Sequence, residues 1–360
     1  MSLRGAPVLI RRRSNLVFKS EIASSLACQQ LFLAMTITNY NYNLTSLAKK
    51  EEKRYNNDME NKHCGIVTII GRPNTGKSTL LNRIIGEKVA IVSQVPQTTR
   101  NIIRGILNEA RGQIVFVDTP GIHKPDDRLN KQMNILAEDS ARGADVILHL
   151  VDSSKNIGEE EARVVDFLVT SKTPVVLALN KIDLGAKFVS DYLALWEEKK
   201  GKTVKELADK LIIFPLSALK GTNVDKLLDL LFFLLPLSPP LYPEDALTDF
   251  PLRLACADII RQPLFECMRE EIPHSIAVLV DEIAERSEKM AYIKADIFVE
   301  RPSQKAMVIG KNAHVLKKIG TQARKELEAL LEKKVFLDLN VKVKENWRKD
   351  IELLKRMGVV

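Results

Sequence analysis

The stretch Gly71-Arg-Pro-Asn-Thr-Gly-Lys-Ser78 decides the fold of the first large part of this chain. It matches G-x-x-x-x-G-K-[ST], follows the apolar run Gly65–Gly71 and leads into a helical pattern at Lys77–Ile85. In this context the backbone N–H groups of the loop and of the helix N-terminus point at phosphates. The pattern therefore predicts a nucleoside triphosphate site, with Lys77 on the β and γ oxygens and Ser78 as a Mg²⁺ ligand. The loop residues expected at the phosphates are Gly71, Arg72, Pro73, Asn74, Thr75, Gly76, Lys77 and Ser78.

Around this motif, from Gly65 to Leu235, short apolar runs alternate with amphipathic segments. Runs this apolar are typical of strands that helices cover on both faces. Strands are expected at Gly65–Gly71, Ile102–Leu107, Gln113–Asp118, Val146–Val151, Val175–Leu179 and Leu211–Phe214, and helices at Lys77–Ile85, Glu159–Thr170 and Val224–Leu234. The alternation predicts a doubly wound, mostly parallel α/β P-loop domain of six strands, one of them antiparallel.

A proline-rich segment marks a domain boundary, because four prolines between Pro236 and Pro243 cannot continue a helix. We expect a small α+β domain after it, in the order α-α-β-β-α-α-β. Its expected elements are a helix near Leu252–Arg261, strands at Ser275–Glu285 and Ala291–Val299, a helix–turn–helix at Gln304–Leu331 and a strand at Val335–Lys344. The predicted parts are residues 1–62 as an N-terminal extension, 63–238 as the P-loop domain, and 239–360 as the second domain with a C-terminal tail.

The composition is that of a globular protein, with 45% hydrophobic and 28% charged residues, and no run is long enough for a membrane helix. The four cysteines show no metal-ligand spacing, which makes a Cys/His metal site unexpected and favours a reducing compartment. Residues 301–360 hold 15 basic and 7 acidic side chains, the electrostatic footprint of a phosphate-rich partner. A solvated basic face remains the alternative.

The first 60 residues are rich in arginine and poor in acids before Glu51, which is typical of an organelle transit peptide. The alternative, which we favour slightly, is a misassigned start, with Met35 or Met59 as the true first residue. A disordered extension is a further interpretation. The segment is excluded from fold reasoning on every one of these interpretations.

Two further motifs occur in the order that a guanine-nucleotide site needs. Asp118-Thr-Pro-Gly121 ends one strand, where the carboxylate can reach Mg²⁺ through water and the Gly121 N–H can reach the γ-phosphate. Asn180-Lys-Ile-Asp183 ends another. Its carboxylate can accept two N–H groups that guanine has and adenine lacks, so Asp183 would select GTP over ATP. Asn180 would hold loop geometry and Lys181 would pack along the base.

One threonine of Pro96-Gln-Thr-Thr-Arg100 is expected to complete the Mg²⁺ shell when the γ-phosphate is present. We favour Thr99 over Thr98. The predicted metal ligands are thus Ser78, Thr99 and Asp118, and the residues expected to act in catalysis are Lys77, Thr99 and Gly121.

Together these motifs resemble the five guanine-nucleotide boxes of the Era GTPase family. The resemblance rests on Gly71–Ser78, Pro96–Arg100, Asp118–His123, Asn180–Asp183 and Ser217–Leu219, and it covers about residues 63–360. It implies a GTPase domain that binds GTP, GDP and Mg²⁺. The further nucleotide contacts that we expect are Asp118, Thr119, Pro120, Gly121, Ile122, Asn180, Lys181, Ile182, Asp183, Ser217, Ala218 and Leu219.

The resemblance continues into Val308-Ile309-Gly310-Lys-Asn-Ala313, which lies between two expected helices as the GxxG loop does in a type II KH domain. Such loops clamp a nucleic-acid backbone. The RNA-binding residues that we expect are Gly310, Lys311, Asn312, Ala313, Lys317 and Lys318. Ala313 departs from the family pattern, which usually has glycine there, and this puts the tightness of the clamp in doubt.

What the resemblance implies about function is a GTP-hydrolysing switch that binds the 3′ end of small-subunit (16S-type) ribosomal RNA and acts in 30S assembly. Such a protein is expected in the cytoplasm as a monomer that can associate peripherally with the membrane, or in an organelle if residues 1–60 are a transit peptide. Ile122 stands where Ras-like enzymes have a water-orienting glutamine, so intrinsic hydrolysis should be slow.

Two other readings stay open. One is a GTPase of transfer RNA modification, although this chain lacks the helical domain and the C-terminal cysteine of that class. The other is an RNA-binding module with a vestigial nucleotide site, against which the intact Lys77, Ser78 and Asp183 argue.

Overall fold

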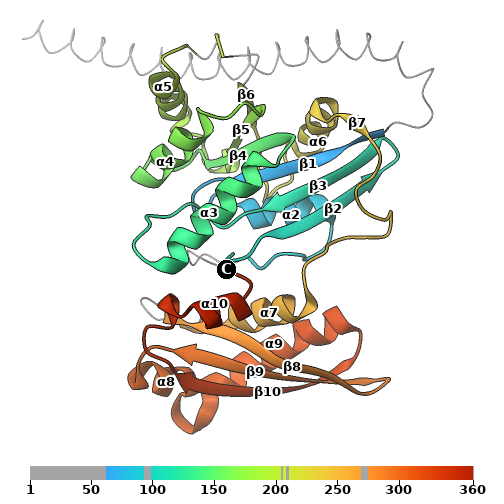
Figure 1. Cartoon of the computed structure of the whole chain (residues 1–360), viewed down its shortest axis with the longest axis vertical. Coiled ribbons are helices and arrows are strands. Elements are labelled where there is room, and N and C mark those ends of the chain that lie inside the picture. The colour runs from blue at the N-terminus through green and yellow to red at the C-terminus, as the bar shows by residue number, and fades with distance from the viewer. Residues whose placement is uncertain (1–61, 93–98, 204–205, 208–210, 269–274, 360) are drawn as a thin grey trace, which may run out of the picture. The chain divides into compact units, whose positions relative to one another are not determined.

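The computed structural model describes residues 62–92, 99–203, 206–207, 211–268 and 275–359, all within the unit that spans residues 62–360. The extension predicted for residues 1–62 lies outside the described residues, except for Lys62, which begins the first strand. Two sheets organise this unit, and each carries its own layer of helices (Figure 1).

The larger sheet has the order β2-β3-β1-β4-β5-β6. Its strands are β1 (Lys62–Ile70), β2 (Ile103–Glu109), β3 (Gly112–Asp118), β4 (Val146–Asp152), β5 (Val175–Asn180) and β6 (Leu211–Pro215). The strands run parallel except for β2, which pairs with β3 in the antiparallel sense. The predicted count of six was one too low, because the two-residue strand β7 (Leu237–Ser238) also pairs antiparallel to β1. A proline-flanked pair of residues has no strand periodicity to detect.

Helices cover both faces of this sheet. Three of them, α3 (Arg128–Arg142), α4 (Glu159–Leu168) and α5 (Val189–Lys200), share one apolar cluster with β4, β5 and β6. On the opposite side lies α2 (Lys77–Ile85), as Figure 1 shows, and α6 (Val224–Leu234) packs along β1. The carboxyl ends of the parallel strands therefore share one edge, where the loops after β1, β3, β5 and β6 meet, as ligand sites of such sheets require.

A single buried side chain clamps the segment that follows β7. The Gln113 carboxamide accepts the N–H groups of Leu241 (2.7 Å) and Tyr242 (2.9 Å) and donates to the Tyr242 carbonyl (2.9 Å). Further on, the Ile106 N–H donates to the Leu247 carbonyl at the edge of the sheet. The proline-rich connection is thus fastened to β2 and β3.

The smaller sheet has the order β10-β9-β8, formed by β8 (Ala277–Ser287), β9 (Met290–Val299) and β10 (Lys334–Val343). One face packs against α7 (Leu252–Cys267), α8 (Pro302–Ile309) and α9 (His314–Leu331) in a common apolar cluster. The predicted order needs correction. Among the described residues one α-helix precedes β8, and a helix that was not predicted, α10 (Ile351–Arg356), follows β10.

Buried residues from both parts of the unit meet beside α10. Leu129 and Met133 of α3 share an apolar cluster with Trp347, Leu354 and Met357. Arg348 forms an ion pair with Asp127 (2.6 Å), whose carboxylate also caps the N-terminus of α3. The tail after β10 is therefore an integral part of the core.

The turn between α8 and α9 uses left-handed backbone. Gly310 has φ 70°, Asn312 has φ 53° and Ala313 has φ 58°. Asparagine tolerates this conformation and glycine adopts it freely, whereas alanine carries a steric cost of about 1–2 kcal/mol. The flanking helices thus fix the conformation of this turn although Ala313 is sterically strained in it.

None of the described helices is long and apolar enough to cross a membrane.

We expect Gln113→Ala to lower the free energy of unfolding by about 1–3 kcal/mol, because it leaves the amides of Leu241 and Tyr242 without their acceptor. Urea unfolding of the purified chain measures this. Gln322→Ala, on the exposed side of α9, is the matched control and should change stability by less than about 0.5 kcal/mol. Equal values for the two variants would contradict the role of Gln113.

We expect Ala313→Gly to raise stability by about 0.5–1 kcal/mol, because glycine adopts the positive φ of this position without steric cost. The same substitution at the exposed helical residue Ala306 should lower stability by about 1 kcal/mol. Thermal unfolding of the two variants compares them directly. A fall in melting temperature for Ala313→Gly would show that the turn does not hold positive φ in solution.

Candidate functional site

The loop between β1 and α2 carries the predicted phosphate motif and packs closely against Asn180. Gly76 has φ 102°, and a Cβ atom there would lie 2.5 Å from the side-chain nitrogen of Asn180. The buried Lys77 ammonium donates to the carbonyls of Gly71 (3.0 Å) and Arg72 (2.9 Å). Burial lowers the pKa of Lys77 to about 8, a shift that Asp118 opposes. The cation therefore sits at the mouth of the loop, where a phosphate would compete for it.

Three oxygen-bearing side chains converge beside Lys77. The Ser78 hydroxyl donates to Oδ2 of Asp118 (2.7 Å) and lies 3.0 Å from Oγ1 of Thr99. Oδ1 of Asp118 is buried and receives no hydrogen bond from the described residues. Hard oxygen donors at this spacing, with an unused carboxylate oxygen, fit a Mg²⁺ ion and its waters.

Burial raises the pKa of Asp118 to about 6, against the opposing effects of Lys77 and Ser78. A proton therefore competes with a cation for this carboxylate at mildly acidic pH. Thr98, the other threonine considered for the metal, lies outside the described residues, as do Pro96 and Gln97.

An open cavity lies over these groups. It is lined by Pro73, Asn74, Gly76, Lys77, Ser78, Thr79, Ile91, Val92, Thr99 and Gly121. The Gly121 backbone is pressed against the loop, since a Cβ atom there would lie 2.8 Å from the Pro73 nitrogen. Residues from two of the predicted motifs, the phosphate loop and Asp118–Gly121, and from the Thr99 segment thus surround one cavity.

The loop after β5 is tied to the phosphate loop by two side chains. Asn180 is buried, donates to the Thr75 carbonyl (2.7 Å) and accepts the Ala218 N–H (2.9 Å). The Lys181 ammonium donates to the Asn74 carbonyl (2.7 Å) and to Asp152 (2.8 Å). Asp183 lies in the short 3₁₀ turn Ile182–Leu184 and is exposed. Its carboxylate is thus accessible to a base.

The residues predicted from Ser217 to Leu219 follow β6 at the same edge. Ser217 is fully buried, its N–H donates to the Thr222 carbonyl, and its hydroxyl accepts the Lys220 N–H. Since Asn180 takes the Ala218 N–H, this loop is braced by the loop after β5. Leu219 is exposed, with 66% of its surface accessible.

Three predicted residues point away from the cavity. The Thr119 hydroxyl is buried and donates to the Ile69 carbonyl (2.8 Å). Ile122 lies in the apolar cluster under α3 and α4. The Arg72 guanidinium extends toward α4 and α5. These three side chains support the residues that line the cavity, and Ile122 offers no polar group to a phosphate.

The turn between α8 and α9 carries exposed cations. Lys311, Lys317 and Lys318 are exposed and form no ion pair with other described residues. Other lysines of the basic C-terminal block are already paired, for example Lys342 with Asp296. Part of the unpaired charge of the block is therefore available at this turn, where Gly310 and Ala313 shape the backbone.

Sequence reasoning missed Asp152, which holds Lys181 from the end of β4, and the buried residues His149 and Glu161 behind the phosphate loop. A signal was present: His149 is a polar residue inside the apolar run Val146–Val151. The sequence does not show that Glu161 is its partner, so such a histidine is interpreted as an ordinary core residue.

Two family models match the chain, one described as "50S ribosome-binding GTPase" over residues 66–181 and one as "KH domain" over residues 271–348. Among curated proteins, GTPase Era of Carboxydothermus hydrogenoformans is 46% identical over 295 residues, which cover 82% of this chain and 97% of that protein. GTPase Era of Thermotoga petrophila is 45% identical over 301 residues, with the same coverage.

Two solved structures match over 83% of this chain and 99% of theirs, at 39% identity. One is Era in complex with MgGDPNP and nucleotides 1506–1542 of 16S ribosomal RNA, with a TM-score of 0.76. The other is an Aquifex aeolicus Era variant bound to GDP and AlF4⁻, with a TM-score of 0.75. With the phosphate loop, Thr99 and Gly121 round one cavity, and with curated GTPase Era proteins 45–46% identical over 97% of their length, the chain belongs to the GTPase Era family.

Proposed function

We propose that this chain binds GTP with Mg²⁺, hydrolyses it slowly, and uses the turn between α8 and α9 to bind small-subunit ribosomal RNA during 30S assembly. The observation that carries the nucleotide part is the convergence of Ser78, Thr99 and Asp118 beside Lys77. The ligands of the two solved relatives, a GTP analogue with 16S ribosomal RNA and GDP with AlF4⁻, support the same assignment.

Each group at the cavity has a defined task in this proposal. Lys77 exchanges the carbonyls of Gly71 and Arg72 for β and γ oxygens of GTP. Ser78 and Thr99 would be direct ligands of Mg²⁺, and Asp118 would accept a hydrogen bond from a water bound to the ion. The Mg²⁺ ion, when bound, neutralises charge that develops on the phosphates. Gly121 offers its N–H to the γ-phosphate.

The water that attacks the γ-phosphate finds no side chain at position 122 to orient it, because Ile122 is apolar and buried. Slow turnover follows, since positioning and charge stabilisation supply most of the catalysis of phosphoryl transfer. A protein carrying this site acts as a switch whose two states persist, which suits a step in assembly better than rapid metabolism of GTP.

For the RNA, Gly310–Ala313 would clamp the backbone while Lys311, Lys317 and Lys318 meet phosphates. We propose the cytoplasm, where small subunits are assembled, as the place of action. The peripheral contact with a membrane and the monomeric state remain predictions.

We expect Asp183→Asn to weaken GTP binding and to shift the preference toward xanthosine triphosphate, whose 2-oxo group needs a donor. Competition binding with GTP, ATP and xanthosine triphosphate measures this. Asp191→Asn, the same change on the exposed side of α5, is the matched control and should bind like the wild type. Unchanged GTP affinity in Asp183→Asn would remove the assignment of the base site.

We expect Lys311→Glu with Lys317→Glu to weaken binding to an oligonucleotide of the 3′ end of small-subunit ribosomal RNA, because two phosphate contacts become repulsive. Three phosphate contacts give the wild type a salt slope of about −2, at about −0.7 per phosphate on single strands. Fluorescence titration at several salt concentrations measures both quantities.

Lys172→Glu with Lys226→Glu is the control for this pair, since it changes the net charge equally on exposed residues of the P-loop domain. If the two double variants bind alike, the RNA surface lies elsewhere and the exposed lysines after α8 are a solvated face.

A further inference from the structure

Four polar side chains form a buried network behind the phosphate loop. The Arg72 guanidinium lies 3.4 Å from Oε2 of Glu161 through Nε and donates to the Tyr192 hydroxyl through Nη2 (3.3 Å). The other carboxyl oxygen of Glu161 lies 2.7 Å from Nε2 of His149. These residues come from the phosphate loop, α4, α5 and β4, so the network joins four elements that are far apart in the sequence.

The burial of this network is extreme. The side chains of Glu161 and His149 have no exposed surface, and that of Arg72 is 15% exposed. A glutamate in the first turn of a surface helix usually reaches solvent, as Glu159 does in the same turn at 86% exposure. Burying a carboxyl group is costly unless it is paired and hydrogen-bonded. Glu161 obtains both from Arg72 and His149, and the cation that it holds belongs to the phosphate loop.

Arg72 connects the network to the residues at the phosphates. Its carbonyl accepts from the Lys77 ammonium (2.9 Å) and from the Thr75 hydroxyl (3.2 Å). Contacts of the Arg72 side chain with Glu161 and Tyr192 restrict the backbone of Arg72 and therefore the position of its carbonyl. The negative charge of Glu161 also opposes the fall in the pKa of Lys77 that burial causes.

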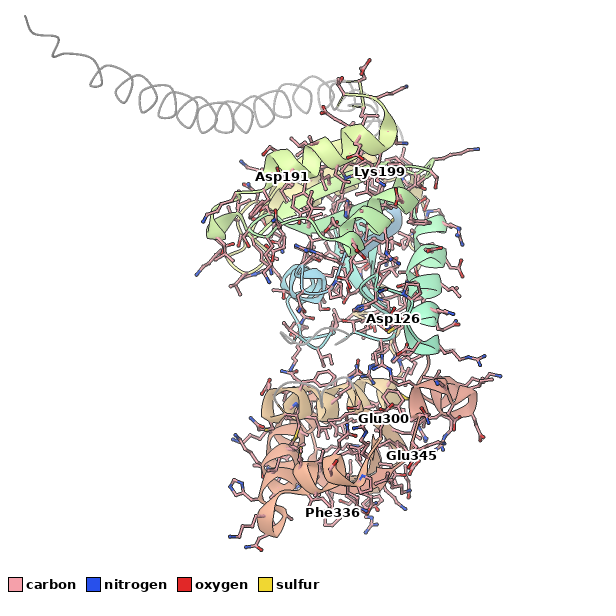
Figure 2. All side chains as sticks on the ribbon, turned by 90° about the vertical axis from the view of Figure 1, so that its left-hand side faces the viewer. Asp126, Asp191, Lys199, Glu300, Phe336 and Glu345 are labelled. Carbon is pink, nitrogen blue, oxygen red and sulfur yellow. The ribbon has the colours of Figure 1, made fainter. Side chains whose placement is uncertain are left out.

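The second half of the loop is anchored separately, through Asn180 on the Thr75 carbonyl and Lys181 on the Asn74 carbonyl. Tyr192 links the two anchorages, because its hydroxyl donates to the carbonyl of Asp152, and the Asp152 carboxylate holds Lys181 (2.8 Å). Figure 2 labels Asp191 and Lys199 on the same helix, α5. Asp191 is exposed, whereas Tyr192 and Trp196 are buried beneath the helix.

We propose that Glu161 is a positioning residue for the phosphate-binding loop, which it holds through Arg72, while His149 and Tyr192 keep this pair in place. The inference rests on the nucleotide site proposed above and adds to it a buried support that none of the predicted motifs contains. Glu161 touches no substrate. It acts by fixing the backbone of Arg72, whose carbonyl accepts a hydrogen bond from Lys77 in this structure, so that the loop amides and Lys77 are already in place for the phosphates.

The test is a double-mutant cycle on nucleotide binding. Glu161→Gln keeps the shape and removes the charge, and Arg72→Ala removes the group through which Glu161 acts. We expect each single variant to release a fluorescent GDP analogue about tenfold faster than the wild type, the lower end of the loss caused by removing residues that orient ligands from behind. We expect the double variant to be no worse than Arg72→Ala alone, because the ion pair with Arg72 is the contact through which Glu161 holds the loop.

Controls separate positioning from general stability. Glu159→Gln, the same change in the same helical turn, should release the analogue at the wild-type rate. RNA affinity and the melting temperature without nucleotide report on the fold, and a purely structural role would lower the melting temperature without the non-additive effect on release. If Glu161→Gln does not fold, the release rate of Arg72→Ala alone tests the inference. This substitution removes the same ion pair through its partly exposed partner.

An unchanged release rate in Glu161→Gln or in Arg72→Ala, or additive effects in the double variant, would overturn the inference. These results are distinct from failure of the proposed function, in which the wild-type chain would bind no guanine nucleotide.

Discussion

The side-chain amide of Asn180 is the contact on which the nucleotide site depends. Its nitrogen holds the phosphate loop by the Thr75 carbonyl, and its oxygen holds the loop after β6 by the Ala218 N–H. Gly76 is part of the same contact, because any Cβ atom there would occupy the place of the Asn180 nitrogen. One buried carboxamide therefore sets the distance between the phosphate and base ends of the site, and it does so with no freedom to shift.

The supports of the site are more deeply buried than the groups that would meet the nucleotide. Asp183 and Leu219 are exposed at the base end, while Asn180, Glu161, His149 and Tyr192 lie in the interior. Preorganisation explains this arrangement: a loop whose carbonyls are already engaged by fixed side chains keeps its N–H groups free for phosphate oxygens. Pairing within each cluster, such as that of Glu161 with His149 and Arg72, offsets part of the energetic cost of these buried polar groups.

In the second domain, many charged side chains are likewise paired with one another, and a few are left exposed. Basic residues of the C-terminal block pair with acidic residues from β8 and β9, as Lys342 does with Asp296 and Arg356 with Asp281. The lysines after α8 are left exposed beside a turn of positive φ. The composition shows only that the last 60 residues carry excess positive charge, whereas the fold places three of the exposed lysines together at this turn.

The sequence by itself determined the order of the strands and of the helices α2, α4 and α6 around the phosphate loop, since these helices and each predicted strand are present within a few residues. The helices α3 and α5 were not among the predicted elements. It also determined which motifs belong together, because their chemistry depends on residue type and order along the chain. Only the tertiary structure decided what depends on packing between distant segments. The strand β7 forms because β1 has a free edge near its start. Thr119 and Ile122 turn inward because they pack against the sheet and its helices. Glu161 reaches Arg72 because α4 lies beside the loop. Such contacts join residues tens of positions apart, and a local pattern carries no information about them.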